Sequence, residues 1–358
     1  MASSQLPFGH YATVHAYPQG PGDDRPIATQ ILRNEGLLDI PNRLSGKTVF
    51  ITGGTSGLGL EVAKALHSTG AKIFITGRCE PANGRDIAST IRNAAGISNK
   101  NNIHPVRFVS MDLADLTSVR DGAADFLKQS HNKLNLLICN AGVMAFDKWM
   151  MTAQGHEMQF GVNHLAHFLL FKTLCPALLA TSAEDFASRV VTVSSCAHRG
   201  SGLLAKYDTS KALGMAYGQS KTANIYMANE LERRFSARGL HGLSVHPGVI
   251  LETGLVRHLA DDYKQLETQF NDTMPGFEYE AKNAQQGAAS IIWAAVAAKL
   301  EGVGGLYLED CDVAQPATEG MDENFEWFKR GRSGWCYDRA AEEKLWLDSE
   351  HMVESWLL

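Results

Sequence analysis

The chain has 358 residues, a net charge of -6 and 44% apolar residues, which is the composition of a soluble globular protein with a sizeable core. The charge is mild and no basic block is present, so we expect no nucleic-acid partner. The six cysteines show neither a CxxC pair nor a metal-binding spacing. We therefore expect reduced thiols, a cytoplasmic location and no metal site.

Residues 1–45 are predicted to be an N-terminal extension, because proline and glycine punctuate them and no secretory signal is visible. A short helix is expected within residues 28–38. From residue 47 onward, apolar strand-like segments alternate with helix-length stretches, which favours a parallel sheet covered on both faces. The expected strands are residues 48–51, 72–76, 106–110, 134–139, 189–194, 243–246 and 305–308.

A glycine-rich segment, residues 52–59, follows the first expected strand and opens a helix-like run that ends at Gly70. Glycines at such a turn let backbone N–H groups approach an anion at the positive end of the helix. We therefore predict a dinucleotide site here, with a plain tight turn as the alternative. The predicted cofactor-binding residues of this segment are Gly53, Thr55, Ser56, Gly57, Leu58 and Gly59.

Arg78 follows the second expected strand, where a dinucleotide fold places the residue that reads the adenosine ribose. A carboxylate at this position would accept a hydrogen bond from the 2′-hydroxyl, but the first acidic residue after the second expected strand is Glu80. The guanidinium of Arg78 can instead pair with a 2′-phosphate, which favours NADP(H) over NAD. The alternative is an ordinary solvated arginine.

Further cofactor contacts are expected where the third and fourth strands end. Asp112 and Leu113 are predicted to lie near the adenine, unless the aspartate only caps a helix or turn. Asn140, Ala141 and Gly142 are predicted to border the cofactor and tie adjacent strands together, with a purely structural turn as the alternative.

Tyr217 and Lys221 are four residues apart at the start of a helix-like run, so their side chains share one helix face. A free phenol has a pKa of about 10, and a nearby ammonium lowers that pKa toward the range that suits general acid–base catalysis. Ser195 ends the fifth expected strand and can hold a substrate oxygen in line with the phenol.

A second tyrosine–lysine pair, Tyr207 and Lys211, has the same spacing, and either pair would match by chance. Gly214 interrupts the stretch after Lys211, whereas an Ala-rich amphipathic run follows Lys221. We therefore predict that Tyr217 and Lys221 carry the chemistry and that Tyr207 lies in a loop near the mouth of the site.

Together these motifs resemble the short-chain dehydrogenase/reductase superfamily from about residue 47 to about residue 308. Residues 111–114 and 156–165 are similar to the retinol dehydrogenase and WW-domain oxidoreductase branch, in its catalytic domain only. The expected fold is therefore α/β: one doubly wound Rossmann domain over residues 46–310, with about seven parallel strands and helices on both faces. Residues 311–358 are expected to form an aromatic-rich extension packed on the body.

The resemblance also implies roles for residues. Tyr217 would be the acid–base, Lys221 its activator and a ribose ligand, Ser195 the anchor of the substrate oxygen, and Asn163 the holder of a water that links the lysine to solvent. The segment that would pass beside the nicotinamide is Pro247, Gly248, Val249 and Ile250.

The resemblance places a threonine shortly after this segment, in contact with the nicotinamide amide. Here Thr253 stands one residue later than usual, so this contact stays open.

The implied reaction is hydride transfer between NADP(H) and a ketone, aldehyde or alcohol. In this family residues 254–282 form a flap over the substrate, and the flap and the C-terminal tail are rich in aromatic residues here. Such walls suit a bulky apolar substrate of the kind found in specialised metabolism. The alternative is that the aromatic residues only bury the tail against the body.

Other functions stay open on the same fold, namely a cofactor-binding redox sensor or scaffold, or an epimerase, dehydratase or imine reductase. The presence of both Tyr217 and Lys221 favours an enzyme. The apolar run of residues 165–179 is short for a membrane span and is expected to be buried or to face a second subunit. A homodimer is therefore one arrangement that the sequence permits.

Overall fold

An eight-stranded sheet, in the order β3-β2-β1-β4-β5-β6-β7-β8, organises the computed structural model. The structure describes residues 9–40, 42–94, 104–144, 148–204, 207, 213–255, 268, 271–272, 276–317 and 330–357. The strands are β1 (Thr48–Ile51), β2 (Lys72–Gly77), β3 (Arg107–Ser110), β4 (Leu136–Cys139), β5 (Ser188–Val193), β6 (Leu240–His246), β7 (Leu306–Glu309) and β8 (Asp312–Val313).

Strands β1 to β7 are all parallel, and β1 lies between β2 and β4, so the strand order reverses at β1. This confirms the doubly wound α/β fold, whose ligands bind at the carboxyl ends of the strands near such a reversal. Strand β8, which the sequence did not predict, pairs antiparallel with β7. The chain turns between them at Asp310 and Cys311, both with positive φ.

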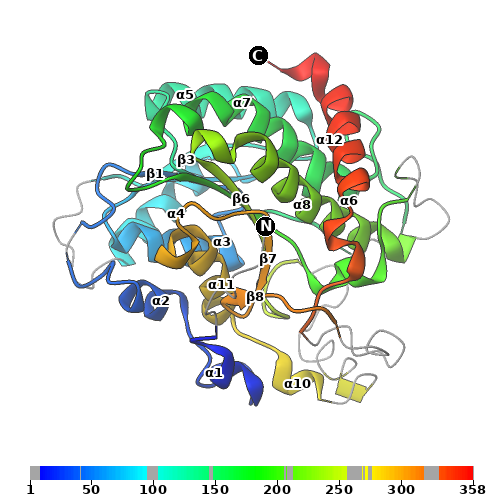
Figure 1. The fold of residues 1–358 in the computed structure, drawn as a ribbon. Coiled ribbons are helices and arrows are strands. Elements are labelled where there is room, and N and C mark those ends of the chain that lie inside the picture. Colours follow the sequence, from blue (N-terminus) through cyan, green and yellow to red (C-terminus); the bar gives the residue numbers. More distant parts are fainter. Residues whose placement is uncertain are drawn as a thin grey trace.

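Helices cover both faces of the sheet (Figure 1). One layer contains α2 (Ala28–Asn34), α3 (Gly57–Ser68), α4 (Pro81–Ala94) and α11 (Ala284–Val296), and the other contains α5 (Leu116–Ser130), α7 (Ala166–Thr181) and α8 (Leu213–Phe235). Helix α12 (Arg339–Val353) packs outside α8. The shorter helices are α1 (Ala12–Ala16), α6 (Met158–Phe160), η1 (Gly161–Leu165), η2 (Cys196–Gly200), η4 (Ser236–Arg238), α10 (Phe277–Glu280), η5 (Ala298–Leu300), η6 (Gly334–Tyr337) and η7 (Glu354–Trp356).

Side chains of β1 alternate between the two faces of the sheet, and both faces are buried, which explains why the sequence of this strand is continuously apolar. Val49 and Ile51 belong to the core cluster that also contains side chains of α3 and α11. Phe50 belongs to the cluster on the opposite face, where its ring stacks on Phe126 of α5 at 4.3 Å. A strand that is buried on both faces needs apolar side chains in both directions.

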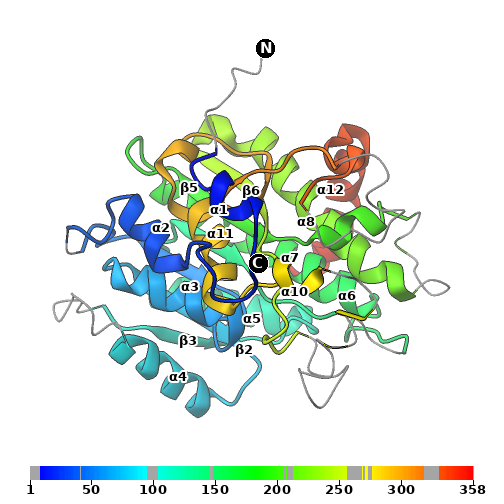
Figure 2. The same cartoon turned by 90° about the horizontal axis from the view of Figure 1, so that it is seen from below.

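The N-terminal segment packs beside α10, and the two lie side by side in both views (Figures 1 and 2). The guanidinium of Arg25 is buried and donates to the carbonyl oxygens of Tyr279, Glu280 and Ala281. These contacts fasten the last residues of the predicted substrate flap to the protein body. The helix expected within residues 28–38 is present as α2.

The first half of the apolar helix α7 is covered by α12 of the same chain. Trp346 is 2% exposed, and its ring lies 4.9 Å from Phe168 and 5.9 Å from Phe171. By length and composition, Met158–Thr181 is the one described helix that could cross a membrane, but 67% of its apolar window is buried within the protein. Its environment is therefore that of a core helix.

Candidate active site

The glycine-rich turn forms a cradle at the N-terminus of α3. Gly53 and Gly57 have φ values of +66° and +52°, which glycine adopts without strain. A Cβ at Gly59 would collide with the Gly53 carbonyl, so the helix approaches the strand end closely. Ser56 occupies the N-cap position without a side-chain cap, which leaves the first-turn N–H groups for an anion. These residues fit the phosphates of a dinucleotide.

Arg78 lies just past the end of β2, and its side chain is exposed. Within the described part of the chain it has no acidic partner, so its charge is available to a ligand at this edge. Thr55 of the glycine-rich turn lies close by, because a Cβ at Gly77 would stand 2.7 Å from its Oγ1. The glycine-rich turn and the end of β2 therefore border one space.

Asp112 has the turn-forming contact that the sequence offered as the alternative to adenine binding. Its Oδ1 accepts from the Ala114 N–H at 3.0 Å. Its own N–H donates to Ser118 Oγ at 2.9 Å. Leu113 is buried in the core, so any contact of this residue with a cofactor would come from its backbone.

The turn after β4 is tied to the end of β1, as expected. The Asn140 side-chain amide donates to the Thr52 carbonyl at 2.9 Å. The N–H groups of Asn140 and Ala141 each donate to Thr52 Oγ1 at 3.0 Å. A Cβ at Gly142 would stand 3.2 Å from Asn163 Oδ1 and 3.5 Å from Lys221 Nζ, so this glycine borders two predicted catalytic side chains.

Tyr217, Lys221 and Ser195 meet at the carboxyl end of β5. Lys221 Nζ lies 5.3 Å from the centre of the Tyr217 ring and donates to the Val193 carbonyl at 2.9 Å. The Ser195 hydroxyl lies close enough to the phenol of Tyr217 to interact with it and to lower its pKa. The neighbouring Ser194 instead donates to the Lys221 carbonyl at 2.8 Å, which gives it a structural contact.

Burial controls the protonation of the pair in the free protein. Burial raises the pKa of Tyr217, and the interaction with Ser195 only partly opposes this effect. Burial also lowers the pKa of Lys221 to about 7, so the ammonium is itself only partly charged at neutral pH. The sequence-based expectation of a phenol made acidic by the lysine is therefore not met in the free protein. Tyr217 is a protonated phenol, which suits a proton donor.

Asn163 lies in the π-helix η1, directly before α7. Single π-turns within helices are common at functional sites. Its side-chain amide accepts from the Val143 N–H at 2.8 Å and donates to the Val143 carbonyl and to Ser220 Oγ, both at 2.9 Å. The side chain thus joins the segment after β4 to α8. The predicted role in holding a water would fall to the main-chain carbonyl oxygen of Asn163. This oxygen accepts a hydrogen bond from His167 Nδ1.

The segment after β6 passes between the glycine-rich turn and Lys282. Gly248 has a φ of +99°, and a Cβ there would lie 2.7 Å from the Lys282 side chain. The Val249 carbonyl accepts from the Lys282 N–H at 2.8 Å, while Pro247 is buried. The methyl group of Thr253 would be 3.4 Å from a Cβ at Gly57. Thr253 therefore lies at the glycine-rich turn.

The competing tyrosine, Tyr207, points toward α12. Its hydroxyl donates to Asp348 at 2.7 Å, and its ring stacks on Phe160 at 4.7 Å. Lys211 lies outside the described residues. Gly214 lies within the first turn of α8, so the interruption expected at this glycine is wrong. Helices tolerate a glycine at a cost of about 1 kcal/mol.

Part of the predicted substrate wall lies outside the described residues. In the tail, Trp346 is buried against α7, as the alternative interpretation expected, whereas Trp335 and Tyr337 are each 37% exposed. Phe277 is buried and Tyr279 is 51% exposed. The flap and tail residues outside the description are Leu259, Tyr263, Leu266, Phe270, Met274, Trp327 and Phe328.

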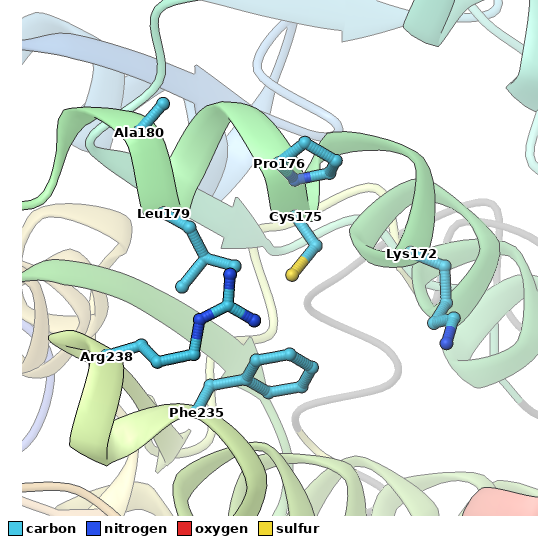
Figure 3. Close-up of a pocket in the computed structure, with 7 residues that line it drawn as sticks. All are labelled: Lys172, Cys175, Pro176, Leu179, Ala180, Phe235 and Arg238. Atoms are coloured by element: carbon cyan, nitrogen blue, oxygen red, sulfur yellow. The ribbon is translucent and has the colours of Figure 1, made fainter.

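A depression of about 560 Å³ lies between the second half of α7 and the end of α8 (Figure 3). Its lining residues are Lys172, Cys175, Pro176, Leu179, Ala180, Phe235 and Arg238. Asn163 and Tyr217 lie near the opposite ends of these two helices, so this depression is separate from the active site. No group of His, Cys, Asp or Glu residues within the described ranges is arranged to hold a metal ion.

Three residues that the sequence analysis did not single out help to build the site. Thr52 anchors the turn after β4. Ser220 donates to the Tyr217 carbonyl at 2.8 Å and accepts from Asn163. His167 bridges Thr52 and Asn163. Thr52 and Ser220 stand inside recognised motifs, so their positions were visible, but their hydrogen-bond partners depend on the tertiary fold.

The fold and this constellation define a nucleotide-dependent oxidoreductase, and comparisons with known proteins agree. The family model for the short chain dehydrogenase matches residues 47–264. Oxidoreductase calI from Penicillium decumbens is 43% identical over 97% of this chain and 98% of its own length. The WW domain-containing oxidoreductase of Gallus gallus is 35% identical over 78% of this chain and 65% of its own length.

A solved structure with the same fold is that of an uncharacterised protein from Mycobacterium paratuberculosis. It is 28% identical with a TM-score of 0.61, over 89% of this chain and 97% of that chain. The chain belongs to the short-chain dehydrogenase/reductase family, whose members use NAD(P)(H), and is an oxidoreductase. Structures of the same fold have been solved with NADP and with NADH.

Proposed function

We propose that this protein is an NADP(H)-dependent oxidoreductase that interconverts a ketone or aldehyde and an alcohol on a bulky apolar small molecule. The observation that carries the proposal is the meeting of Tyr217, Lys221 and Ser195 at the carboxyl end of β5. Bound NADPH supplies the hydride, and the family provides this chemistry with NAD(P)(H). The side chains of this protein hold the substrate oxygen and move the proton.

In the reducing direction, the Ser195 hydroxyl orients the carbonyl oxygen and Tyr217 gives its proton to the developing alkoxide. Burial raises the pKa of the phenol, which keeps this proton in place until the oxygen becomes basic. Lys221 stands beside the ring and supports the proton exchange. Such acid catalysis contributes about 10²–10⁴ in rate, and positioning adds to it.

Arg78 supports the choice of NADP(H). It is exposed at the end of β2, beside the glycine-rich turn, and this is the position of the ribose-reading residue in dinucleotide folds. A guanidinium there can hold a 2′-phosphate by charge-assisted hydrogen bonds. A carboxylate in its place would repel that phosphate.

Trp335 supports a bulky apolar substrate. Its indole ring stands 4.0 Å from a Cβ at Gly202, in the segment that follows Ser195 and η2, and it is partly exposed. Aromatic walls of this kind suit a polycyclic or terpenoid molecule, and we propose a place in specialised metabolism. The Penicillium decumbens relative aligns with this protein over almost the whole length of both chains, including most of the two extensions.

The test uses purified protein, NADPH and a panel of bulky apolar ketones and aldehydes, with small polar ketones as the matched control. We expect loss of the nicotinamide absorbance with the bulky compounds. Tight binding of NADPH without turnover of any carbonyl would favour a redox sensor or scaffold instead. Release of water or inversion of a stereocentre without net oxidation would point to a dehydratase or an epimerase.

We also propose that residues 46–310 act as the catalytic domain and that residues 1–45 and 311–358 brace it. Arg25 and Trp346 provide the bracing contacts. Because α12 already covers the first half of α7, a homodimer would have to form through another face. Size-exclusion chromatography with light scattering of wild-type protein tests this, and a dimer that disappears when residues of the first half of α7 change would contradict it.

We propose a cytoplasmic location, which the six free cysteines support because a reducing compartment keeps them unpaired. A fluorescent fusion followed by microscopy tests the location. A signal confined to a membrane or to the secretory pathway would overturn it.

A further inference from the structure

A buried histidine on α7, His167, connects the cofactor cradle to the catalytic asparagine. Its side chain is 1% exposed, and both ring nitrogens have a partner. Nδ1 lies 2.9 Å from the Asn163 carbonyl oxygen. Nε2 lies 2.8 Å from Thr52 Oγ1.

These two partners fix where the ring carries its proton. A carbonyl oxygen only accepts, so Nδ1 must donate, and Nε2 is then the acceptor for the Thr52 hydroxyl. Burial, with a smaller contribution from the charge of Lys221, lowers the pKa of His167 to about 4, and the hydrogen bond to the Asn163 carbonyl only partly opposes this effect. The ring is therefore neutral and in a single tautomer across the neutral pH range.

The Thr52 hydroxyl uses all of its hydrogen-bonding capacity in this arrangement. It accepts the N–H groups of Asn140 and Ala141, each at 3.0 Å, and donates its one proton to His167. A second acceptor, the Ile138 carbonyl, is more distant at 3.4 Å. The imidazole thus completes a continuous series of hydrogen bonds that connects the end of β1, the turn after β4 and η1.

We propose that His167 is a positioning residue that holds the Asn163 carbonyl, the turn after β4 and the end of β1 in one fixed arrangement. Through Thr52 it sets the cradle predicted to receive the dinucleotide, and through Asn163 it sets the main-chain oxygen that is predicted to hold the water between Lys221 and solvent. The proposal rests on the proposed function, because it assigns His167 a part in the same site. No contact with substrate or cofactor is required of this residue.

His164 offers a matched control on the same helical segment. It is fully buried and neutral as well, because burial lowers its pKa to about 3. Its Nε2 lies 2.9 Å from Ser349 Oγ of α12, on the side away from the cradle. Any general cost of changing a buried histidine in this helix should therefore appear in His164 variants too.

Two substitutions separate the two hydrogen bonds of His167. His167→Asn keeps a donor near the Nδ1 position but removes the acceptor of the Thr52 hydroxyl. We expect the Kd of NADPH, measured by fluorescence titration, to rise about tenfold, with little change in kcat. His167→Gln keeps an acceptor for Thr52 but removes the donor to Asn163. We expect kcat to fall about tenfold, with a shifted pH profile and an NADPH Kd within twofold of wild type.

His164→Gln should leave kcat and the NADPH Kd within twofold, whatever its effect on thermal stability. If both His167 variants behave like His164→Gln, the positioning role is wrong. Should His167→Asn fail to fold, Thr52→Val removes the same hydrogen bond from its other end, together with the two that Thr52 accepts from Asn140 and Ala141, so the Kd should rise at least as much.

A readout without catalysis tests the tautomer directly. Nitrogen-15 spectra of histidine-labelled protein should show His167 as a neutral ring with its proton on Nδ1, and a charged ring or an Nε2–H ring would overturn the proposal. This result, like the NADPH Kd, is independent of whether any carbonyl is reduced. Absence of turnover in the wild-type protein would therefore defeat the proposed function while leaving the test of His167 intact.

Discussion

Tyr217 and Tyr207 each stand four residues before a lysine, but the structure gives them opposite surroundings. Tyr217 lies on α8 beside Lys221 and Ser195, at the sheet edge that holds the glycine-rich turn. Tyr207 stacks on Phe160 and donates to Asp348 of α12. The same local spacing therefore serves a reactive site in one place and the anchoring of a C-terminal helix in the other, and tertiary contacts decide which.

The sharpest test of this difference is Tyr217→Phe. We expect turnover to fall by about 10²–10⁴, because the proton donor is lost, while the NADPH Kd stays within twofold. Steady-state kinetics and fluorescence titration measure the two quantities. Turnover that survives in this variant would remove Tyr217 from the mechanism.

The pH dependence tests whether Lys221 acts as a charged neighbour of Tyr217. Burial lowers the pKa of Lys221 to about 7, so the ammonium is present below this pH and is lost above it. We expect kcat/KM for reduction to fall with rising pH, approaching about tenfold per unit above the pKa. Lys221→Arg keeps its charge and should move the fall to higher pH. A flat wild-type profile between pH 6 and 9 would contradict this assignment.

Arg78→Ala tests whether NADPH binds along the carboxyl edge of the sheet, where both Arg78 and Tyr217 lie. We expect the Kd of NADPH to rise about tenfold, because a charge-assisted pair with the 2′-phosphate contributes about 1.5–3 kcal/mol. The Kd of NADH should change less than twofold. Arg238→Ala, in η4 just beyond the far end of α8, provides the control and should alter neither value. Equal effects of Arg78→Ala on both nucleotides would defeat the preference for NADP(H).

The smallest effect is expected from Tyr207→Phe. Loss of the hydrogen bond to Asp348 should lower the free energy of unfolding by about 1 kcal/mol, with turnover within twofold of wild type. Denaturant unfolding and kinetics check the two values. Asp348→Asn should have a similar effect on stability. If Tyr207→Phe instead abolishes turnover, the roles of the two tyrosines are reversed.

Much of the fold followed from the sequence because β1 to β7 are apolar and separated by helices. The bounds of β1 matched, while β6 begins earlier than expected, at Leu240. The expected strand began only at Leu243, after Gly242. In the structure Gly242 lies inside β6, where a Cβ would collide with the Ala228 carbonyl of α8. The glycine serves the close approach of a helix, and no local pattern reveals such an approach.

The site was visible in the sequence where motifs are short and local, as at the glycine-rich turn and at Tyr217 and Lys221. Its electrostatics were not visible, because the burial that raises the pKa of Tyr217 and lowers the pKa of Lys221 depends on the tertiary fold. The bridge of His167 was hidden too, since Thr52 is distant in the sequence and the two meet only when α7 packs against the sheet.

The cover that α12 provides for α7 has a consequence for how the protein is made. Because α12 follows the sheet and α7 in the sequence, it emerges from the ribosome after them. Until then Phe168 and Phe171 lack the indole ring that shields them. The nascent chain therefore passes through a stage with an exposed aromatic surface, of the kind that chaperones bind and that promotes aggregation.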